Sequence, residues 1–239
     1  MKNTVELLGH YGSDSIHAQS AWTSTSRDLT DDKLERIPKL LSMLASEGHH
    51  TPFEKSSLHF LVTVDQASHI HLLKHRVGVS INGESARYKE LKEDKFIIPR
   101  DFKGVSVDKK HHNMNYIRNQ VVANYRDYDW MQALYDFTIL GNALYHKCLE
   151  DLTPVLGRKR AKESARFFKT FNSQITMDVM FNWRSFYHFQ QLRNSEHAQK
   201  EIKTLANTML YLVENIPNNP FKDTLAAFNL ISDKDNLLI

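Results

Sequence analysis

The sequence predicts an α+β fold, a single domain over residues 1–239 in which a small mixed or antiparallel sheet is flanked by long helices. Three observations support this prediction. Short segments alternate apolar and polar residues with the period of a strand, and longer segments repeat apolar residues with helical spacing. No repeat of fixed period, low-complexity tract or Gly/Ser linker divides the chain, which is long enough to bury a sizeable core.

The strand pattern is clearest over residues 58–64, where four apolar residues alternate with other side chains and β-branched residues are frequent. Residues 175–181 alternate in the same way. A third, shorter strand is expected at residues 96–98, directly before Pro99. These segments are the predicted sheet.

The first predicted helix covers residues 30–47, with Pro38 expected to kink it or to delay its start and Gly48 expected to end it. Residues 66–76 form a second, short helix, and the Gly- and Ser-containing stretch 78–85 is expected to be a loop. The strand, helix and loop together deliver a polar cluster.

A long helical pattern follows from about residue 113 to residue 152, with a break expected near Gly141. Its content is expected to be structural and to supply much of the core. The remaining predicted segments are a polar loop over 101–112 and helices over 182–191 and 196–214. The chain end after Pro217 is expected to be irregular except for residues 225–230.

Composition excludes several classes of protein. The net charge of +3 is too small to predict nucleic-acid binding by itself, so any basic site must be local. No apolar run approaches the roughly 18 to 20 residues that span a bilayer, and the first residues are polar. We therefore expect a cytoplasmic protein with no membrane and no nucleic-acid partner.

Cysteine and histidine content argues against two other kinds of site. Cys148 is the only cysteine, so neither an internal disulfide nor a multi-cysteine zinc site is possible. It is in phase with Leu144 on the long helix, which favours burial over service as a nucleophile. The thirteen histidines include the 69/71/75 and 111/112 groups, but no converging acidic or cysteine ligand is evident, so no metal is expected.

A dense group of polar side chains follows the second predicted helix. It contains cations, hydroxyls and an amide within fifteen residues, namely Lys74, His75, Arg76, Ser80, Asn82, Glu84, Ser85, Arg87 and Tyr88. Charged donors together with backbone amides freed by Gly83 are what an anionic phosphate needs. For any single residue, a solvated basic loop is an equally good interpretation, but for the whole group a phosphate site is favoured.

The stretch KHRVGVSINGESARY, residues 74–88, resembles the signature of flavin-dependent thymidylate synthases: Arg-His-Arg, seven residues, then Ser and a nearby Arg-Tyr. Two departures are visible. Lys74 replaces the first arginine, and eight residues separate Arg76 from Ser85. The acidic residue is also displaced, because Gly83 precedes it.

Other segments carry the resemblance further. Residues 48–54, GHHTPFE, are similar to the family's Gly-His-x-Thr-Pro-Phe-Glu segment. The second half of the signature is similar to residues 182–201, with His188 where Asn is common, and Ala165-Arg166 precedes it at the expected interval. Each arginine or histidine alone is more often a surface or satisfied residue, but their order over about 150 residues weakens that interpretation.

The resemblance implies reductive methylation of dUMP to dTMP. Methylenetetrahydrofolate would be the carbon donor, and NADPH-reduced FAD would be the hydride source. It also implies a homotetramer with sites between subunits, in which the two halves of the signature meet across an interface.

The resemblance further assigns the site residues. The residues expected to line the flavin are Ser24, Thr51, Glu54, Lys74, His75, Arg76, Asn182, Arg184 and His188. Those expected to hold the nucleotide are Glu84, Ser85, Arg87, Arg166 and Arg193. The candidate catalytic residues are Arg193 and Ser85. Arg193 would polarise a pyrimidine carbonyl, whereas Ser85 has no spaced Asp/His pair to activate it, so phosphate binding is its preferred role.

Two alternatives remain open at this point. The displaced acidic residue in Asn82-Gly83-Glu84-Ser85 leaves room for a flavin- and folate-dependent enzyme that methylates or hydroxymethylates another pyrimidine nucleotide, such as dCMP. A non-enzymatic nucleotide- or RNA-binding relative would keep the basic cluster without turnover.

Overall fold

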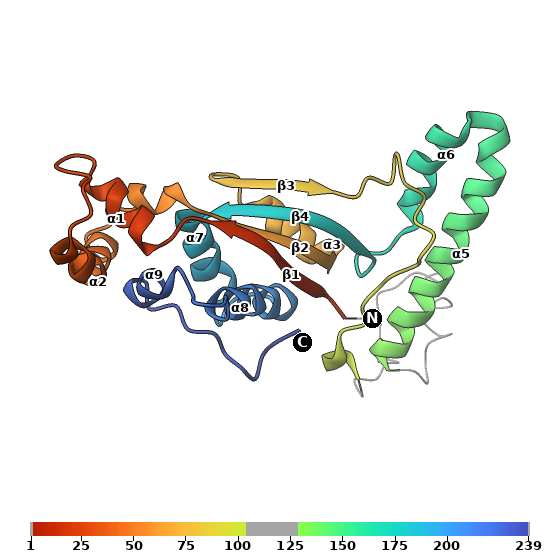
Figure 1. The fold of residues 1–239 in the computed structure, drawn as a ribbon. Helices are drawn as coiled ribbons and strands as arrows, with labels where there is room; N and C mark the ends of the chain where they lie inside the picture. The colour runs from red at the N-terminus through yellow and green to blue at the C-terminus, as the bar shows by residue number, and fades with distance from the viewer. Residues whose placement is uncertain (1, 104–128, 239) are drawn as a thin grey trace. The chain divides into compact units, whose positions relative to one another are not determined.

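The computed structural model describes residues 2–103 and 129–238, and the chain separates into two compact units (Figure 1). Unit 1 contains Met1–Lys2 and Glu84–Gln174, and unit 2 contains Asn3–Gly83 and Ile175–Ile239. The chain thus contains two compact units, and the prediction of a single domain stays a prediction.

A four-stranded sheet forms the centre of unit 2 (Figure 1). Its strands, in the spatial order β1-β2-β4-β3, are β1 Thr4–Tyr11, β2 Ser57–Asp65, β3 Val79–Gly83 and β4 Gln174–Asn182. Strands β1 and β2 pair antiparallel, as do β3 and β4. The predicted α+β fold is confirmed, and so are the strands predicted over residues 58–64 and 175–181.

The helices of unit 2 lie around this sheet. They are α1 Asp14–Trp22, α2 Asp31–Ser46, the short 3-10 helix η1 Thr51–Lys55, α3 Gln66–Leu73, α7 Trp183–Arg193, α8 Lys200–Glu214 and α9 Lys222–Ala227. Helix α8 contacts β1 and α7, whereas α9 contacts α2 (Figure 1). The helices predicted over 66–76, 182–191 and 196–214 are therefore present, with shifted ends.

Polar caps fix where two of these helices begin. The carboxylate of Asp65 accepts a hydrogen bond from the backbone N–H of Ser68 at 2.8 Å, at the start of α3. Asn182 accepts one from the backbone N–H of Ser185 at 2.9 Å, at the start of α7. Such caps satisfy donors that the first turn of a helix leaves unpaired. Both helices therefore begin directly where a sheet strand ends.

Helix α2 begins at Asp31, next to the predicted start, and runs through Pro38. This proline was expected either to kink the helix or to delay its start, and the delay does not occur. Its other end agrees with the prediction: Gly48 has φ +73, a conformation that a glycine adopts without the steric cost of a side chain.

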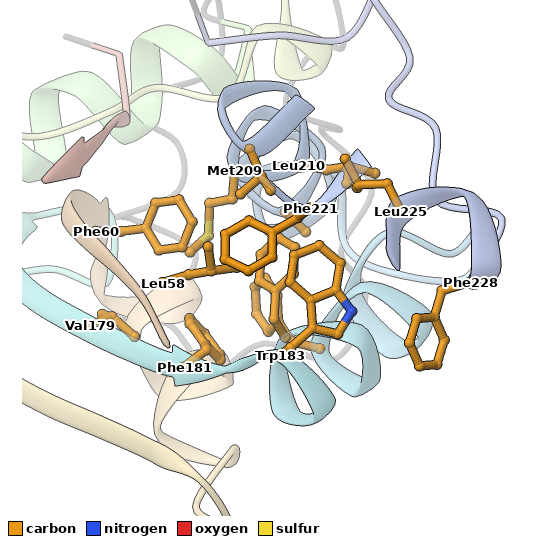
Figure 2. Packing of buried hydrophobic residues seen from close by; sticks show 14 of the residues in the cluster. Leu58, Phe60, Val179, Phe181, Trp183, Met209, Leu210, Phe221, Leu225 and Phe228 are labelled. Atoms are coloured by element: carbon orange, nitrogen blue, oxygen red, sulfur yellow. The ribbon is translucent and has the colours of Figure 1, made fainter. Parts of the chain in front are cut away.

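The hydrophobic core of unit 2 is built on aromatic rings (Figure 2). Phe60 from β2 and Phe181 from β4 are fully buried, and so are Trp183 and Phe221. The rings of Trp183 and Phe221 stack with centroids 5.0 Å apart. The core thus joins the sheet to the first turn of α7 and to the segment that leads into α9 (Figure 2).

The described residues of unit 1 form mainly helices. They are α5 Trp130–Leu156, α6 Arg158–Ala165 and two 3-10 turns, η2 Arg100–Phe102 and η3 Arg166–Phe168. A small core contains Tyr145 and Leu149 of α5 with Ala161 and Ala165 of α6, and Cys148 packs partly buried against it. Residues 113–128 of the predicted long helix and residues 104–112 of the predicted loop, including both histidines of the 111/112 group, lie outside the described residues.

The break predicted near Gly141 was wrong, because α5 runs through it without interruption. A Cβ at this position would lie 2.7 Å from the carbonyl oxygen of Phe168. The glycine therefore permits a close approach of the chain that follows α6, and it does not end a helix.

Three further elements differ from prediction. Strand β1 and helix α1 were not predicted, and β3 lies inside the stretch predicted to be a loop. The strand predicted over residues 96–98 was wrong, since Phe96 forms only an isolated bridge with Ser173. Every helix in the described part of the chain is too short or too polar to span a bilayer.

Candidate functional site

A cavity of about 690 Å³ opens in unit 2 where η1, the end of α3, the start of β3 and helix α7 come together. Its walls contain eight of the predicted site residues: Glu54, Lys74, His75, Arg76, Asn182, Arg184, His188 and Arg193. Two segments more than 100 residues apart in the sequence, the first half of the basic signature and the second half, thus line one cavity within a single chain.

The turn after α3 brings the first segment to the cavity. Helix α3 ends at Leu73, so Lys74, His75 and Arg76 follow its last turn. Gly78 then has φ +65 and directs the chain into β3. The three signature residues therefore occupy a short connection between a helix and a strand, where polar groups reach a cavity more readily than in a packed element.

Gly78 also touches the second segment. A Cβ at this position would lie 2.4 Å from both the amide nitrogen of Asn182 and the hydroxyl of Ser185. The hydroxyl of Ser185 donates to the carbonyl oxygen of Val77 at 2.6 Å, and the backbone N–H of Asn182 donates to that of Gly78 at 3.0 Å. These contacts join the turn to the first residues of α7.

Arg193 and His75 form the central contact of the cavity. The Nε of Arg193 donates to Nε2 of His75 at 3.0 Å, so that ring nitrogen carries no proton. Burial, the positive charge of Arg193 and the neighbouring His188 and His71 together lower the pKa of His75 to about 4, with burial the largest cause. The rings of His75 and His188 lie 6.0 Å apart. His75 is therefore neutral near pH 7.

Arg184 and Glu54 form an ion pair across the cavity. The guanidinium Nη1 lies 2.6 Å from the carboxylate Oε1, linking the first turn of α7 to η1. Neither Lys74 nor Arg76 forms an ion pair with any residue in the described ranges, and both are exposed. The cavity thus keeps unneutralised cations that an anionic ligand could contact.

His71 lies close to the cavity residues without lining the cavity, and the sequence prediction did not assign it to the site. This residue lies on α3 one turn before His75, and its Nδ1 is buried with no hydrogen-bond partner among the described residues. Burial lowers its pKa, and the charge of Arg193 lowers it further. The spacing of four residues from His75 was a signal that could have identified it, because such residues share a helix face.

Two residues predicted for the flavin do not line this cavity. Ser24 is exposed, and its hydroxyl donates to the carbonyl oxygen of Ala21 at 3.2 Å. Thr51 is the exposed first residue of η1. Their predicted role stays a prediction.

The other predicted nucleotide residues belong to unit 1. The Nε of Arg87 pairs with the carboxylate of Glu163 at 2.7 Å, and its backbone N–H donates to the hydroxyl of Ser85 at 3.3 Å. Glu84 pairs with Lys89. Arg166 begins η3. Within unit 1, therefore, Arg87 is held to helix α6 by a charged hydrogen bond.

Metal ligands do not converge in the described part of the chain, where no group of three or more His, Cys, Asp or Glu could hold an ion. The fold and the site together define a class: an α+β protein whose cavity, lined by cations and by the uncharged His75, suits a large anionic organic ligand.

Comparison with known proteins identifies the family. Residues 6–217 match the family model described as thymidylate synthase complementing protein. A flavin-dependent thymidylate synthase of Tropheryma whipplei is 29% identical over 240 residues, covering 94% of this chain and 91% of the relative. One from Clostridium tetani is 28% identical over 198 residues, covering 82% and 73%.

Solved structures agree on the fold. A UMP/dUMP methylase, PolB, from Streptomyces cacaoi bound with 5-Br dUMP superposes with a TM-score of 0.71 at 23% identity, covering 97% of this chain and 96% of that chain. This chain belongs to the thymidylate synthase complementing protein family, whose members compared above are flavin-dependent thymidylate synthases. It is an enzyme of the methyltransferase class.

Proposed function

We propose that this chain is a flavin-dependent thymidylate synthase that methylates dUMP reductively to dTMP. Methylenetetrahydrofolate is the carbon donor, and FAD reduced by NADPH is the hydride source. Family membership supports the flavin and the reaction class. Structures of the fold neighbour with 5-Br dUMP and with 5-Br UMP support a pyrimidine nucleotide as substrate.

One observation carries the proposal: a single cavity gathers seven of the nine residues that the resemblance assigns to the flavin. They are Glu54, Lys74, His75, Arg76, Asn182, Arg184 and His188. Its volume of about 690 Å³ is within the usual size of a cofactor site. The absence of a side chain at Gly78 lets Asn182 and Ser185 approach the turn closely, which holds together the two segments that line the cavity.

The charged and polar residues of the cavity have different proposed roles. Lys74 and Arg76 bind the anionic diphosphate, and the Glu54–Arg184 pair orients the two walls. Asn182 caps α7, and its helix N-terminus favours negative charge nearby. When bound, the flavin supplies the redox chemistry.

Arg193 has the role closest to the reacting atoms. Its Nε bonds to neutral His75, and no described residue bonds to its two terminal nitrogens. These nitrogens polarise a carbonyl of the pyrimidine as charge develops on the ring, an electrostatic contribution of about 3 kcal/mol in comparable sites. His75 thus fixes the orientation of Arg193.

The nucleotide residues of unit 1 keep the roles that the resemblance gives them. Ser85, Arg87 and Arg166 bind the nucleotide phosphate, and Glu84 is a weaker candidate for contact with the nucleotide. A homotetramer with sites between subunits is part of the same proposal, and the cytoplasmic location stays a prediction.

The test begins with purification. A yellow protein with flavin absorbance bands, which forms dTMP from dUMP in the presence of methylenetetrahydrofolate and NADPH, supports the proposal. Mass spectrometry of the nucleotide product identifies the transferred group. A colourless protein that FAD does not reconstitute contradicts the proposal and favours a nucleotide-binding module without turnover.

A second candidate substrate is tested in the same assay. Gly83 ends β3 and separates Asn82 from Glu84, which pairs with Lys89. This local arrangement differs from the family signature and favours a test of dCMP beside dUMP. If only dCMP yields a modified product, dCMP replaces dUMP as the proposed substrate, and the proposed flavin site is unchanged.

A further inference from the structure

A chain of buried hydrogen bonds in unit 2 lies outside the residues that line the cavity. At its centre is His17 of α1, whose side chain is fully buried. Its Nε2 lies 2.8 Å from the hydroxyl of Ser56, and its Nδ1 lies 3.0 Å from the hydroxyl of Thr224. One imidazole therefore bridges α1, the residue that follows η1, and α9.

Asp14 fixes the direction of these hydrogen bonds. Its carboxylate accepts the hydroxyl proton of Thr224 and the backbone N–H groups of Asp223 and Thr224, the latter two at 2.8 Å. The oxygen of Thr224 is therefore left to accept from Nδ1–H of His17, and Nε2 accepts from the hydroxyl of Ser56. Every member has a partner only in this one arrangement, so the network specifies a single geometry.

The ring of His17 packs against one aromatic residue of η1 and one of α7, the elements that contribute Glu54 and Arg184 to the cavity. Its ring lies 5.1 Å from that of Phe53 in η1 and 6.2 Å from that of Trp183 at the start of α7. Each of these aromatic residues directly precedes one member of the ion pair, Glu54 or Arg184. His17 thus contacts residues of both η1 and α7.

We propose that His17, held by Ser56 and Thr224, is a positioning residue of the flavin site that keeps η1 and the first turn of α7 in register, so that Glu54 and Arg184 meet. The inference rests on the proposed function. It assigns a role in cofactor binding to three residues that do not line the cavity.

The test measures the dissociation constant of FAD for the full chain by quenching of flavin fluorescence. Thr224→Val removes the hydroxyl that holds His17 and should raise the dissociation constant about tenfold, the effect of one lost hydrogen bond. Thr224→Ser keeps the hydroxyl and should stay within about twofold of wild type.

Thr208→Val is the matched control. Thr208 is also fully buried, but its hydroxyl bonds to the carbonyl oxygen of Thr204 at 2.7 Å and to the N–H of Leu238 at 3.0 Å, neither of them in η1 or α7. We expect Thr208→Val to lower the melting temperature comparably without a change in FAD affinity. All measurements are made at a temperature where circular dichroism reports each variant folded.

The possible results distinguish a failure of the positioning role of His17 from a failure of the proposed flavin site. Equal FAD affinities for the Thr224→Val and Thr208→Val variants, beside a wild type that binds FAD, would overturn the positioning role alone. A wild type that binds no FAD would overturn the flavin site and this role with it. If Thr224→Val does not fold, Ser56→Ala replaces it, and an unchanged affinity there overturns the proposal.

Discussion

A guanidinium can donate to a histidine nitrogen only while that nitrogen is unprotonated, and the cavity meets this condition through burial. The pKa of His75 is lowered to about 4, so its Nε2 remains an acceptor for Arg193 over the neutral range. Arg193 itself is always protonated in proteins. On the proposed function, a fixed cation and an uncharged imidazole therefore stand where a reacting pyrimidine would gain negative charge.

Arg193→Ala should separate turnover from cofactor binding. Turnover of dUMP should fall about 100-fold or more, because a donor aimed at developing charge is lost. Flavin content should stay within about twofold, since other cations hold the diphosphate. Flavin absorbance per protein and initial rates of dTMP formation measure the two quantities.

Arg184→Ala, which breaks the pair with Glu54, should instead lower flavin content. Equal losses of flavin in the Arg193→Ala and Arg184→Ala variants would contradict the assignment.

Gly78 is the residue whose substitution should damage the cavity most directly. An alanine Cβ would lie 2.4 Å from the side chains of Asn182 and Ser185 in a backbone conformation, φ +65, that suits glycine. Gly78→Ala should lower the free energy of unfolding by about 1–3 kcal/mol and should weaken FAD binding. Urea unfolding measures the first effect. Gly9→Ala meets nothing within 4 Å and should be neutral, so equal effects would refute the close-contact explanation.

At the scale of elements, a strand could be predicted from the sequence when one of its faces is fully buried in the core. Strand β2 alternates fully buried Leu58, Phe60, Val62 and Val64 with partly exposed residues, and its pattern is plain in the sequence. The edge strands β1 and β3 bury fewer side chains and are held by pairing with their neighbours. Pairing partners lie far away in the sequence, so local patterns do not reveal these strands.

The same distinction applies to the site. The motifs that resemble the family signature identified the cations and histidines assigned to the cavity, because these residues follow one another in the same order as in the signature. They did not identify the need for Gly78 to lack a side chain, since Asn182 and Ser185 impose it from about 100 residues away. The bridge through His17 was equally invisible, because its partners Ser56 and Thr224 are joined only by the fold.

A substitution in helix α5 tests whether a contact made by the fold outweighs local helix propensity. Gly141→Ala would be expected to stabilise an isolated helix by about 1 kcal/mol. In this protein, the added Cβ would lie 2.7 Å from the backbone oxygen of Phe168, so the substitution should instead destabilise unit 1 by about 1–3 kcal/mol. Thermal unfolding followed by circular dichroism measures the change. Leu140→Ala on the exposed surface of the same helix is the control, and a stabilised Gly141→Ala variant would disprove the contact.

For the whole molecule, buried histidines couple stability to acid. Burial lowers the pKa of His17 from 6.5 to about 4. The unfolded chain therefore takes up this proton near pH 6.5, whereas the folded chain resists it until about pH 4. Between these values the unfolded state binds more protons, so stability is complete above pH 6.5 and is lost as the pH falls toward 4. The lowered pKa values of His69, His71 and His75 act in the same direction.

The contribution of His17 can be isolated by comparing pH profiles. The free energy of unfolding of wild type, from urea titrations at several pH values between 7 and 4, should contain about 3 kcal/mol of acid loss from this one residue. His17→Gln should be less stable at pH 7, because Ser56 or Thr224 loses its partner, but its profile should be flatter by that amount. His49→Gln, at an exposed histidine, should reproduce the wild-type profile. Parallel profiles for the wild type and His17→Gln would mean that His17 is not held neutral by the fold.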